Sequence, residues 1–91
     1  MLAKSTARLN GQVAFAKAVL AYKGQDPSQL AQYLATAATM DQTQEEPDTY
    51  AHSVAQQGRM FQGMLARRGA DVVFTSATQL LQDASGFTIH R

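Results

Sequence analysis

The residues of this chain that are best placed to do chemistry are Glu45, Asp48 and His52, which share one face if this segment is helical. Asp48 and His52 are four residues apart, so a carboxylate and an imidazole could meet on the helix surface. A metal site needs a third strong ligand and supporting partners around it, and the sequence supplies neither. We therefore interpret the pair as a first-turn acid beside a solvated histidine, and His90 as a solvated residue near the C-terminus.

Other catalytic chemistries lack their motifs. The chain has no cysteine, which excludes disulfides, zinc–thiolate sites and thiol catalysis. No serine lies in a G-x-S-x-G or S-x-x-K context, and no glycine-rich phosphate loop is present. We therefore expect a protein that is not an enzyme and that uses no cofactor or metal.

The composition is that of a small globular domain with an unusually uncharged surface. Of 91 residues, 45% are hydrophobic and 16% are charged, below the usual quarter. Alanine, glutamine, serine and threonine fill this deficit, which suits outer faces that contact copies of the chain or a partner. The same composition is typical of bacterial or phage proteins.

The net charge of +1 is unevenly distributed along the chain. Residues 1–25 carry four bases and no acid, whereas residues 26–48 carry five acids and no base. Residues 49–91 carry four bases and two acids. Antiparallel helices of opposite charge gain orientation more than stability from such a pattern, since exposed ion pairs contribute roughly 0.2–1 kcal/mol each.

The basic N-terminal segment also has features of a targeting sequence, because it is amphipathic and free of acids. Lys17 interrupts its apolar stretch, and about ten apolar residues are too few for a bilayer, which needs about 20. The segment also supplies much of the apolar surface available for a core. We expect it to be part of the fold, without a membrane span, in a protein that is cytoplasmic.

The stretch from Val13 to Tyr22 dominates the hydrophobic pattern, and Lys17 is its only charge. At about 100° per residue it presents two apolar sides. One side holds Leu2, Leu9, Val13, Ala16 and Leu20, and the other holds Phe15, Val19 and Tyr22. An ordinary surface helix has only one apolar stripe. This helix is therefore either central in the bundle or partly covered by a second molecule.

Start and stop signals predict helices over about residues 3–23, 27–41, 47–68 and 72–84. Gly24 follows the first, and Asp26 with Pro27 is a strong start for the second. Residues 41–49, DQTQEEPDT, form a polar connector in which Glu46 and Pro47 can start the third helix. Arg67 and Arg68 before Gly69 indicate its end.

The last segment has two alternatives. Apolar residues recur at helical spacing through residues 72–84, but Val72 to Thr75 are poor helix formers. The tail GFTIHR could pair with them as a short C-terminal strand. We favour the helix, and so predict an all-α fold: a single domain of residues 1–91 forming a small antiparallel bundle of three to four helices.

Protein–protein contact is the function that the sequence favours. We expect a non-catalytic adaptor, chaperone, inhibitor or regulator that binds a partner protein or itself as an oligomer. Phe15, Val19 and Tyr22 are the predicted anchors, because aromatic and branched residues in a desolvated patch carry most binding energy. If the last helix folds over this side instead, nothing is left exposed.

Two alternatives remain open. A small nucleic-acid-binding regulator would contact phosphates through Lys4, Arg8, Arg67 and Arg68, although the five acids of residues 26–48 would repel the backbone. A structural subunit of a phage or secretion assembly would use the same apolar side for self-association.

Overall fold

The computed structural model describes the backbone of residues 2–89 and the side chains of residues 6–84. Within residues 2–89 it has four helices and no strand: α1 (Leu2–Leu20), α2 (Pro27–Ala38), α3 (Thr49–Arg68) and α4 (Ala70–Ile89). The predicted all-α bundle is confirmed. No helix among the described residues is long and apolar enough to cross a membrane.

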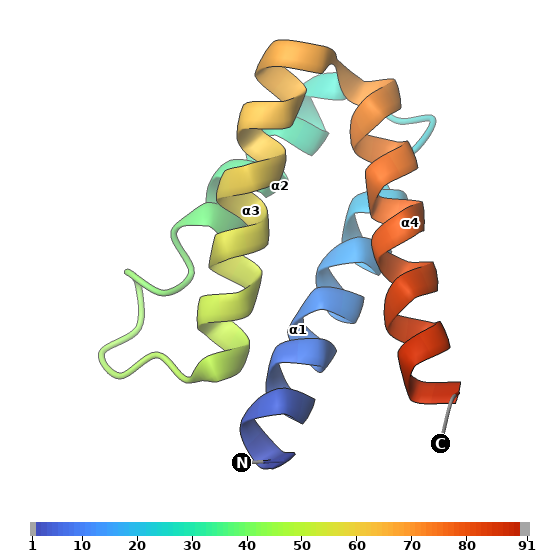
Figure 1. Ribbon diagram of the computed structural model, residues 1–91. Helices are drawn as coiled ribbons and strands as arrows, with labels where there is room; N and C mark the ends of the chain where they lie inside the picture. The colour runs from blue at the N-terminus through green and yellow to red at the C-terminus, as the bar shows by residue number, and fades with distance from the viewer. Residues whose placement is uncertain (1, 90–91) are drawn as a thin grey trace.

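The helices alternate in direction along the bundle, so α1 starts and α4 ends at the same end (Figure 1). Helix α3 packs mainly against α2 and α1, while α4 packs mainly against α1. Helices α1 and α2 are adjacent in sequence but touch each other much less. The resulting body is flat, with Cα extents of 38 × 34 × 19 Å, and its shortest dimension is about two helix diameters.

The core draws on all four helices: Phe15, Ala16 and Val19 from α1, Leu30, Leu34 and Ala37 from α2, Val54 and Phe61 from α3, and Val73 and Ala77 from α4. Aromatic contacts join three of these helices. The ring of Phe15 meets Phe61 edge-on at 5.0 Å between centroids, and it stacks against Tyr33 at 6.0 Å. Residues from both predicted apolar sides of α1 are thus buried within the chain: Ala16 from one side, and Phe15 and Val19 from the other.

Helix ends depart from the predicted ranges by a few residues. Helix α1 ends at Leu20 because the N–H groups of Tyr22 and Lys23 bond to carbonyls three residues back, at 3.0 and 3.1 Å. Helix α2 ends at Ala38 in the same manner. Gly24 follows the α1 turn with a φ of +83°, a value that favours glycine.

Aspartates cap two helix starts. Asp26 accepts a hydrogen bond from the Ser28 N–H at 2.9 Å and begins α2 as predicted. Asp48 accepts from the Ala51 N–H at 2.9 Å, so α3 begins at Thr49 instead of at residue 47. Each carboxylate satisfies an N–H group that has no partner inside its helix.

Helix α4 is longer than predicted and settles the choice between helix and strand. It runs from Ala70 to Ile89, so residues 85–89 continue the helix and do not form the alternative strand. Packing of Val73 and Ala77 in the core outweighs the weak helix preference of the residues around them.

Candidate functional site

Two of the three predicted partner anchors lie in the core. Phe15 is 1% exposed and Val19 is fully buried, and the Phe15 ring contacts Tyr33 of α2 and Phe61 of α3. A partner could reach these two side chains only if the bundle opened. The structure therefore places Phe15 and Val19 in the core, in agreement with the alternative in which this side of α1 is covered within the chain.

Tyr22, the third predicted anchor, is only partly buried. It follows the end of α1, and its ring stacks on Tyr33 of α2 with centroids 5.5 Å apart and planes 29° from parallel. Tyr33 in turn stacks on Phe15. The three rings form a column that runs from the core toward the surface and fixes the position of both tyrosines.

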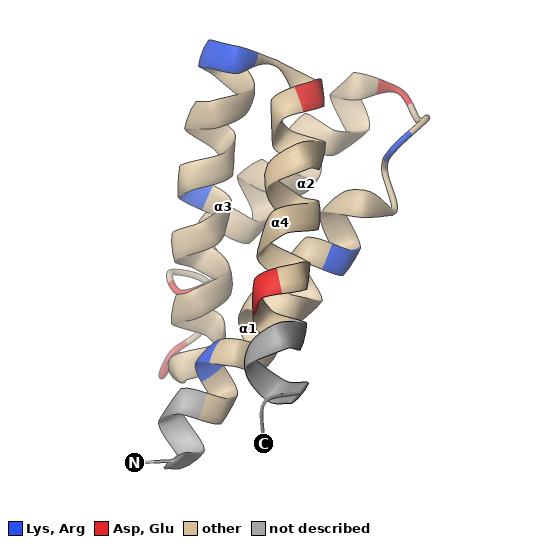
Figure 2. Cartoon of the chain, turned by 45° about the vertical axis from the view of Figure 1, so that its right-hand side comes forward, with Lys and Arg blue, Asp and Glu red and all other residues tan. Residues whose placement is uncertain are grey.

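A groove of about 340 Å³ opens beside this column, and we refer to it as the tyrosine groove. It is lined by Tyr22, Gln29, Gln32, Tyr33 and Thr36. Gln29, Gln32 and Thr36 are exposed on the outer face of α2, which contains no charged residue. Figure 2 shows this absence of charge along α2.

The chemistry of the tyrosine groove is neutral. Burial raises the pKa of Tyr33, and the nearby Tyr22 and Tyr50 hydroxyls add to the effect, so Tyr33 is protonated at neutral pH. The groove therefore offers aromatic faces, two amides and hydroxyl groups, and its lining residues carry no ionised group. Such a surface can bind uncharged polar and apolar side chains, and it has no means of neutralising a phosphate.

Among the described side chains, the predicted phosphate-contacting residues are spread along the bundle. The hydroxyl of Ser53 donates to the Arg8 carbonyl at 3.0 Å, so Arg8 lies level with the first part of α3. Arg67 lies 14 residues further along α3, about 21 Å away at 1.5 Å per residue. Figure 2 shows basic residues at the upper end of α3 and, well below them, on α1. The side chain of Lys4 is outside the described residues, and so is His90.

His52 pairs with Asp41, and not with Asp48 as its spacing predicted. The His52 Nδ1 is 3.2 Å from Asp41 Oδ2, whereas Asp48 caps α3. Arg59 donates to both Asp41 oxygens at 3.4 and 3.5 Å, and to the Ala38 carbonyl at 3.0 Å. Sequence periodicity missed this cluster because Asp41 lies in the connector, 11 residues from His52.

The Asp41 cluster attaches the connector to α3. The Asp41 side chain is 12% exposed, and the Arg59 guanidinium lowers its pKa, against burial and with a smaller contribution from His52. Among the described residues, no three histidine, aspartate or glutamate side chains are grouped as a metal site would require. The arrangement explains the position of the connector.

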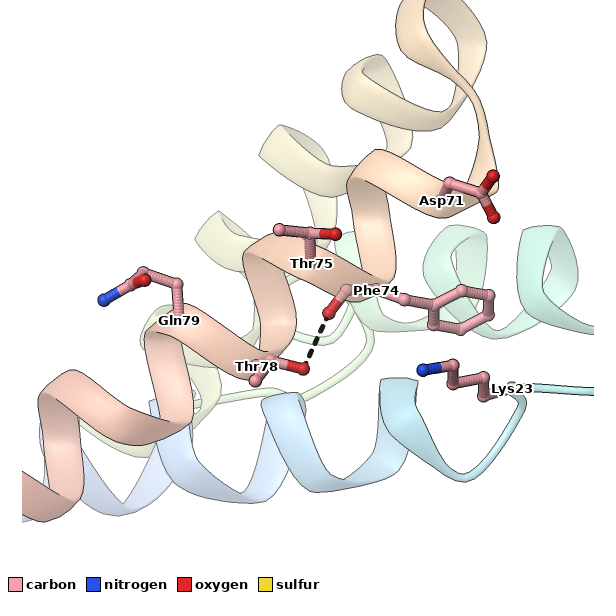
Figure 3. A pocket seen from close by; sticks show the side chains of 6 residues that line it. All are labelled: Lys23, Asp71, Phe74, Thr75, Thr78 and Gln79. Carbon is pink, nitrogen blue, oxygen red and sulfur yellow. Dashed lines mark hydrogen bonds between the residues drawn. The ribbon is translucent and has the colours of Figure 1, made fainter.

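A second surface pocket, of about 350 Å³, lies between the end of α1 and the first half of α4. Figure 3 shows its lining residues, Lys23, Asp71, Phe74, Thr75, Thr78 and Gln79. The Thr78 hydroxyl donates to the Phe74 carbonyl at 3.0 Å, so it serves the helix. The two charged residues that line this pocket, Lys23 and Asp71, are both exposed. This pocket has opposite charges at its edge but no buried polar group directed into it.

Comparisons of the chain with protein-family models, with curated proteins and with solved structures found no match.

Proposed function

We propose that this chain is a non-catalytic helical protein that acts by binding another protein, and that the tyrosine groove is its contact surface. The observation that supports this most is the pair of stacked tyrosines, Tyr22 and Tyr33, at the side of a charge-free groove. Tyrosine is enriched at interface hot spots because it combines a large apolar area with a hydroxyl group.

The fixed position of the two tyrosines adds support. Tyr33 is held between Phe15 and Tyr22, so a partner would not have to order it. Immobilising a flexible side chain costs about 0.5–1.5 kcal/mol on binding, and a preformed surface avoids that cost. Gln29, Gln32 and Thr36 surround the rings with groups that can exchange hydrogen bonds with a partner.

The groove also indicates the chemistry of the partner. A volume of about 340 Å³ is at the small end of ligand sites, enough for one or two side chains. The complementary segment would insert an apolar or aromatic side chain beside the tyrosines and present uncharged polar groups to α2. Arginine-rich or phosphorylated segments would find no charge partner among the lining residues.

Substitutions on the outer face of α2 test this proposal. Gln32→Arg and Thr36→Arg place a long charged side chain at exposed positions of the groove, so the fold should be kept. Gln56→Arg, at an exposed position of α3, is the matched control. Proteins captured from the cells of origin would be compared among the wild type and the three variants, with helicity followed by circular dichroism.

The partner that distinguishes these variants would then be purified and titrated. We expect its Kd to rise more than about tenfold for both groove variants, equivalent to about 1.4 kcal/mol, and to be unchanged for Gln56→Arg. Equal affinity for all four chains would refute the groove as the contact surface. A wild-type dimer that both groove variants convert to a monomer would instead identify a second copy as the occupant.

A further inference from the structure

The connector between α3 and α4 is a single residue. Helix α3 ends at Arg68 and α4 begins at Ala70, which leaves only Gly69 to reverse the chain (Figure 1). Its backbone has φ +94° and ψ 173°, a conformation that is essentially restricted to glycine. The sharp reversal therefore depends on the residue type at one position.

Helical hydrogen bonding nearly continues through this reversal. The Gly69 N–H donates to the Leu65 carbonyl at 3.1 Å, and the Val73 N–H donates to the Gly69 carbonyl at 3.4 Å. Both are bonds between residues four apart, as in an α-helix. Only the N–H groups of residues 70–72, the first turn of α4, lack an acceptor four residues back.

A change of Gly69 to helical angles would therefore join α3 and α4. The joined helix would cover residues 49–89, about 60 Å at 1.5 Å per residue. It would gain three backbone hydrogen bonds, from the N–H groups of residues 70–72 to the carbonyls of residues 66–68. The hairpin and the straight helix thus differ by little local structure.

The main support for α4 comes from α1, and α3 contributes less. Val73 and Ala77 are fully buried and belong to the same core cluster as Ala16 of α1. A straightened chain would carry α4 away and leave this surface of α1 uncovered. The helix that fits that surface is α4, and a second copy of the chain supplies an identical one.

We infer that α4 can exchange between two copies of the chain, with Gly69 as the hinge, to form a domain-swapped dimer. Each α1 in this dimer is covered by the α4 of the other copy, so the core contacts of the monomer form again. The free energies of the monomer and the dimer then differ only through the conformation of the hinge and the entropy lost on association. This inference goes beyond the proposed function and does not involve the tyrosine groove.

Gly69→Ala tests the hinge directly. Alanine is strained in the hairpin and favoured in the straight helix, and the dimer has two hinges. We expect the dimer dissociation constant to fall about 10³-fold relative to the wild type, measured by light scattering over a concentration series. The control is Gly24→Ala, since Gly24 also has a positive φ of 83° and open space around it. Pro27 prevents a continuous helix there, so this variant should remain monomeric.

The shape of the dimer separates a swap from ordinary association. The chain has no cysteine, so Gln56→Cys and Gln82→Cys give two unique label sites at exposed positions of α3 and α4. Labelled Gly69→Ala chains diluted with unlabelled chains should show an intrachain distance of about 39 Å along a straight helix. In the hairpin both sites lie 13 residues from Gly69 on helices that run back along the same bundle, so the distance between the labels would be much shorter.

Two results would overturn the inference: a folded monomer for Gly69→Ala, or a dimer whose labels keep the short distance. If Gly69→Ala does not fold, the wild-type chain provides the test. Refolding it from denaturant at high concentration should trap a dimer with the long intrachain distance, and a dimer-free product would refute the exchange of α4.

Discussion

Gly58 lies where the backbones of α2 and α3 meet. A Cβ atom there would come within 2.6 Å of the Ala38 nitrogen and 2.9 Å of the Ala37 carbonyl carbon, so the two helices would have to separate. We expect Gly58→Ala to lower the free energy of unfolding by about 1–3 kcal/mol, as for other overpacked sites. Urea denaturation followed by circular dichroism measures this change.

Gly63, in the same helix, is the matched control for Gly58. A Cβ there would meet only the end of the Arg67 side chain, which can move. Gly63→Ala should therefore raise the free energy of unfolding by about 1 kcal/mol through helix propensity alone. Equal effects of the two substitutions would show that close packing of α2 and α3 does not require Gly58.

The Asp41 carboxylate, which contacts Arg59 and His52, should make the stability of the fold depend on pH in the acidic range. Its pKa is lowered in the folded chain, so its contribution to stability is present above the unfolded pKa of about 4 and is lost as pH falls through the folded value. Asp41→Asn should be less stable than the wild type at neutral pH. The difference should shrink progressively below about pH 4.

Denaturation midpoints measured from pH 7 down to pH 2 would follow this convergence. Glu45→Gln removes a charge from the same connector at an exposed position, and controls for the change in net charge. A wild-type chain and an Asp41→Asn variant that stay equally far apart at all pH values would contradict the assignment.

At the scale of whole elements, the start of α3 depends on Asp48. Its side chain accepts from the Ala51 N–H, and removing this acceptor leaves that donor without a partner at the helix end. We expect Asp48→Ala to cost about 1 kcal/mol in unfolding free energy and Asp48→Asn, which can still accept the bond, to cost much less. Thermal unfolding of the two variants beside the wild type compares them directly.

Helix starts could be predicted from the sequence better than helix ends. The Asp26–Pro27 signal places the start of α2 correctly, because a cap and a proline act through local backbone chemistry. The ends of α1 and α2 come earlier than predicted, since each last turn tightens to bonds between residues three apart. The spacing of hydrophobic residues does not predict this change in backbone hydrogen bonding.

Contacts between side chains of different helices could not be predicted from the sequence. Periodicity identified both apolar sides of α1 but not which helices cover them, so the sequence left open whether Phe15 and Val19 lie in the core or on a contact surface. The stacking of Tyr33 on Tyr22 also depends on how α2 meets the end of α1. The Asp41 cluster likewise requires the path of the connector.

For the molecule as a whole, a few large side chains provide most of the apolar area buried in the core. Seven of the fourteen buried hydrophobic residues among the described side chains are alanines, which bury little apolar area each. A domain of this size is stable by about 5–14 kcal/mol, so the loss of one large contact is a substantial fraction of the total. Val19, which is fully buried, is such a position.

Val19→Asp therefore tests whether this side of α1 is core or contact surface. A buried carboxylate without a partner costs several kcal/mol, so we expect the variant to lose most of its helicity and its cooperative melting. Asn10→Asp makes the same charge change at an exposed position of α1 and should melt like the wild type. Circular dichroism and light scattering on the same samples separate the alternatives. If the Val19→Asp variant stays helical and only its mass in solution falls, Val19 belongs to a contact surface between molecules, as the sequence predicted.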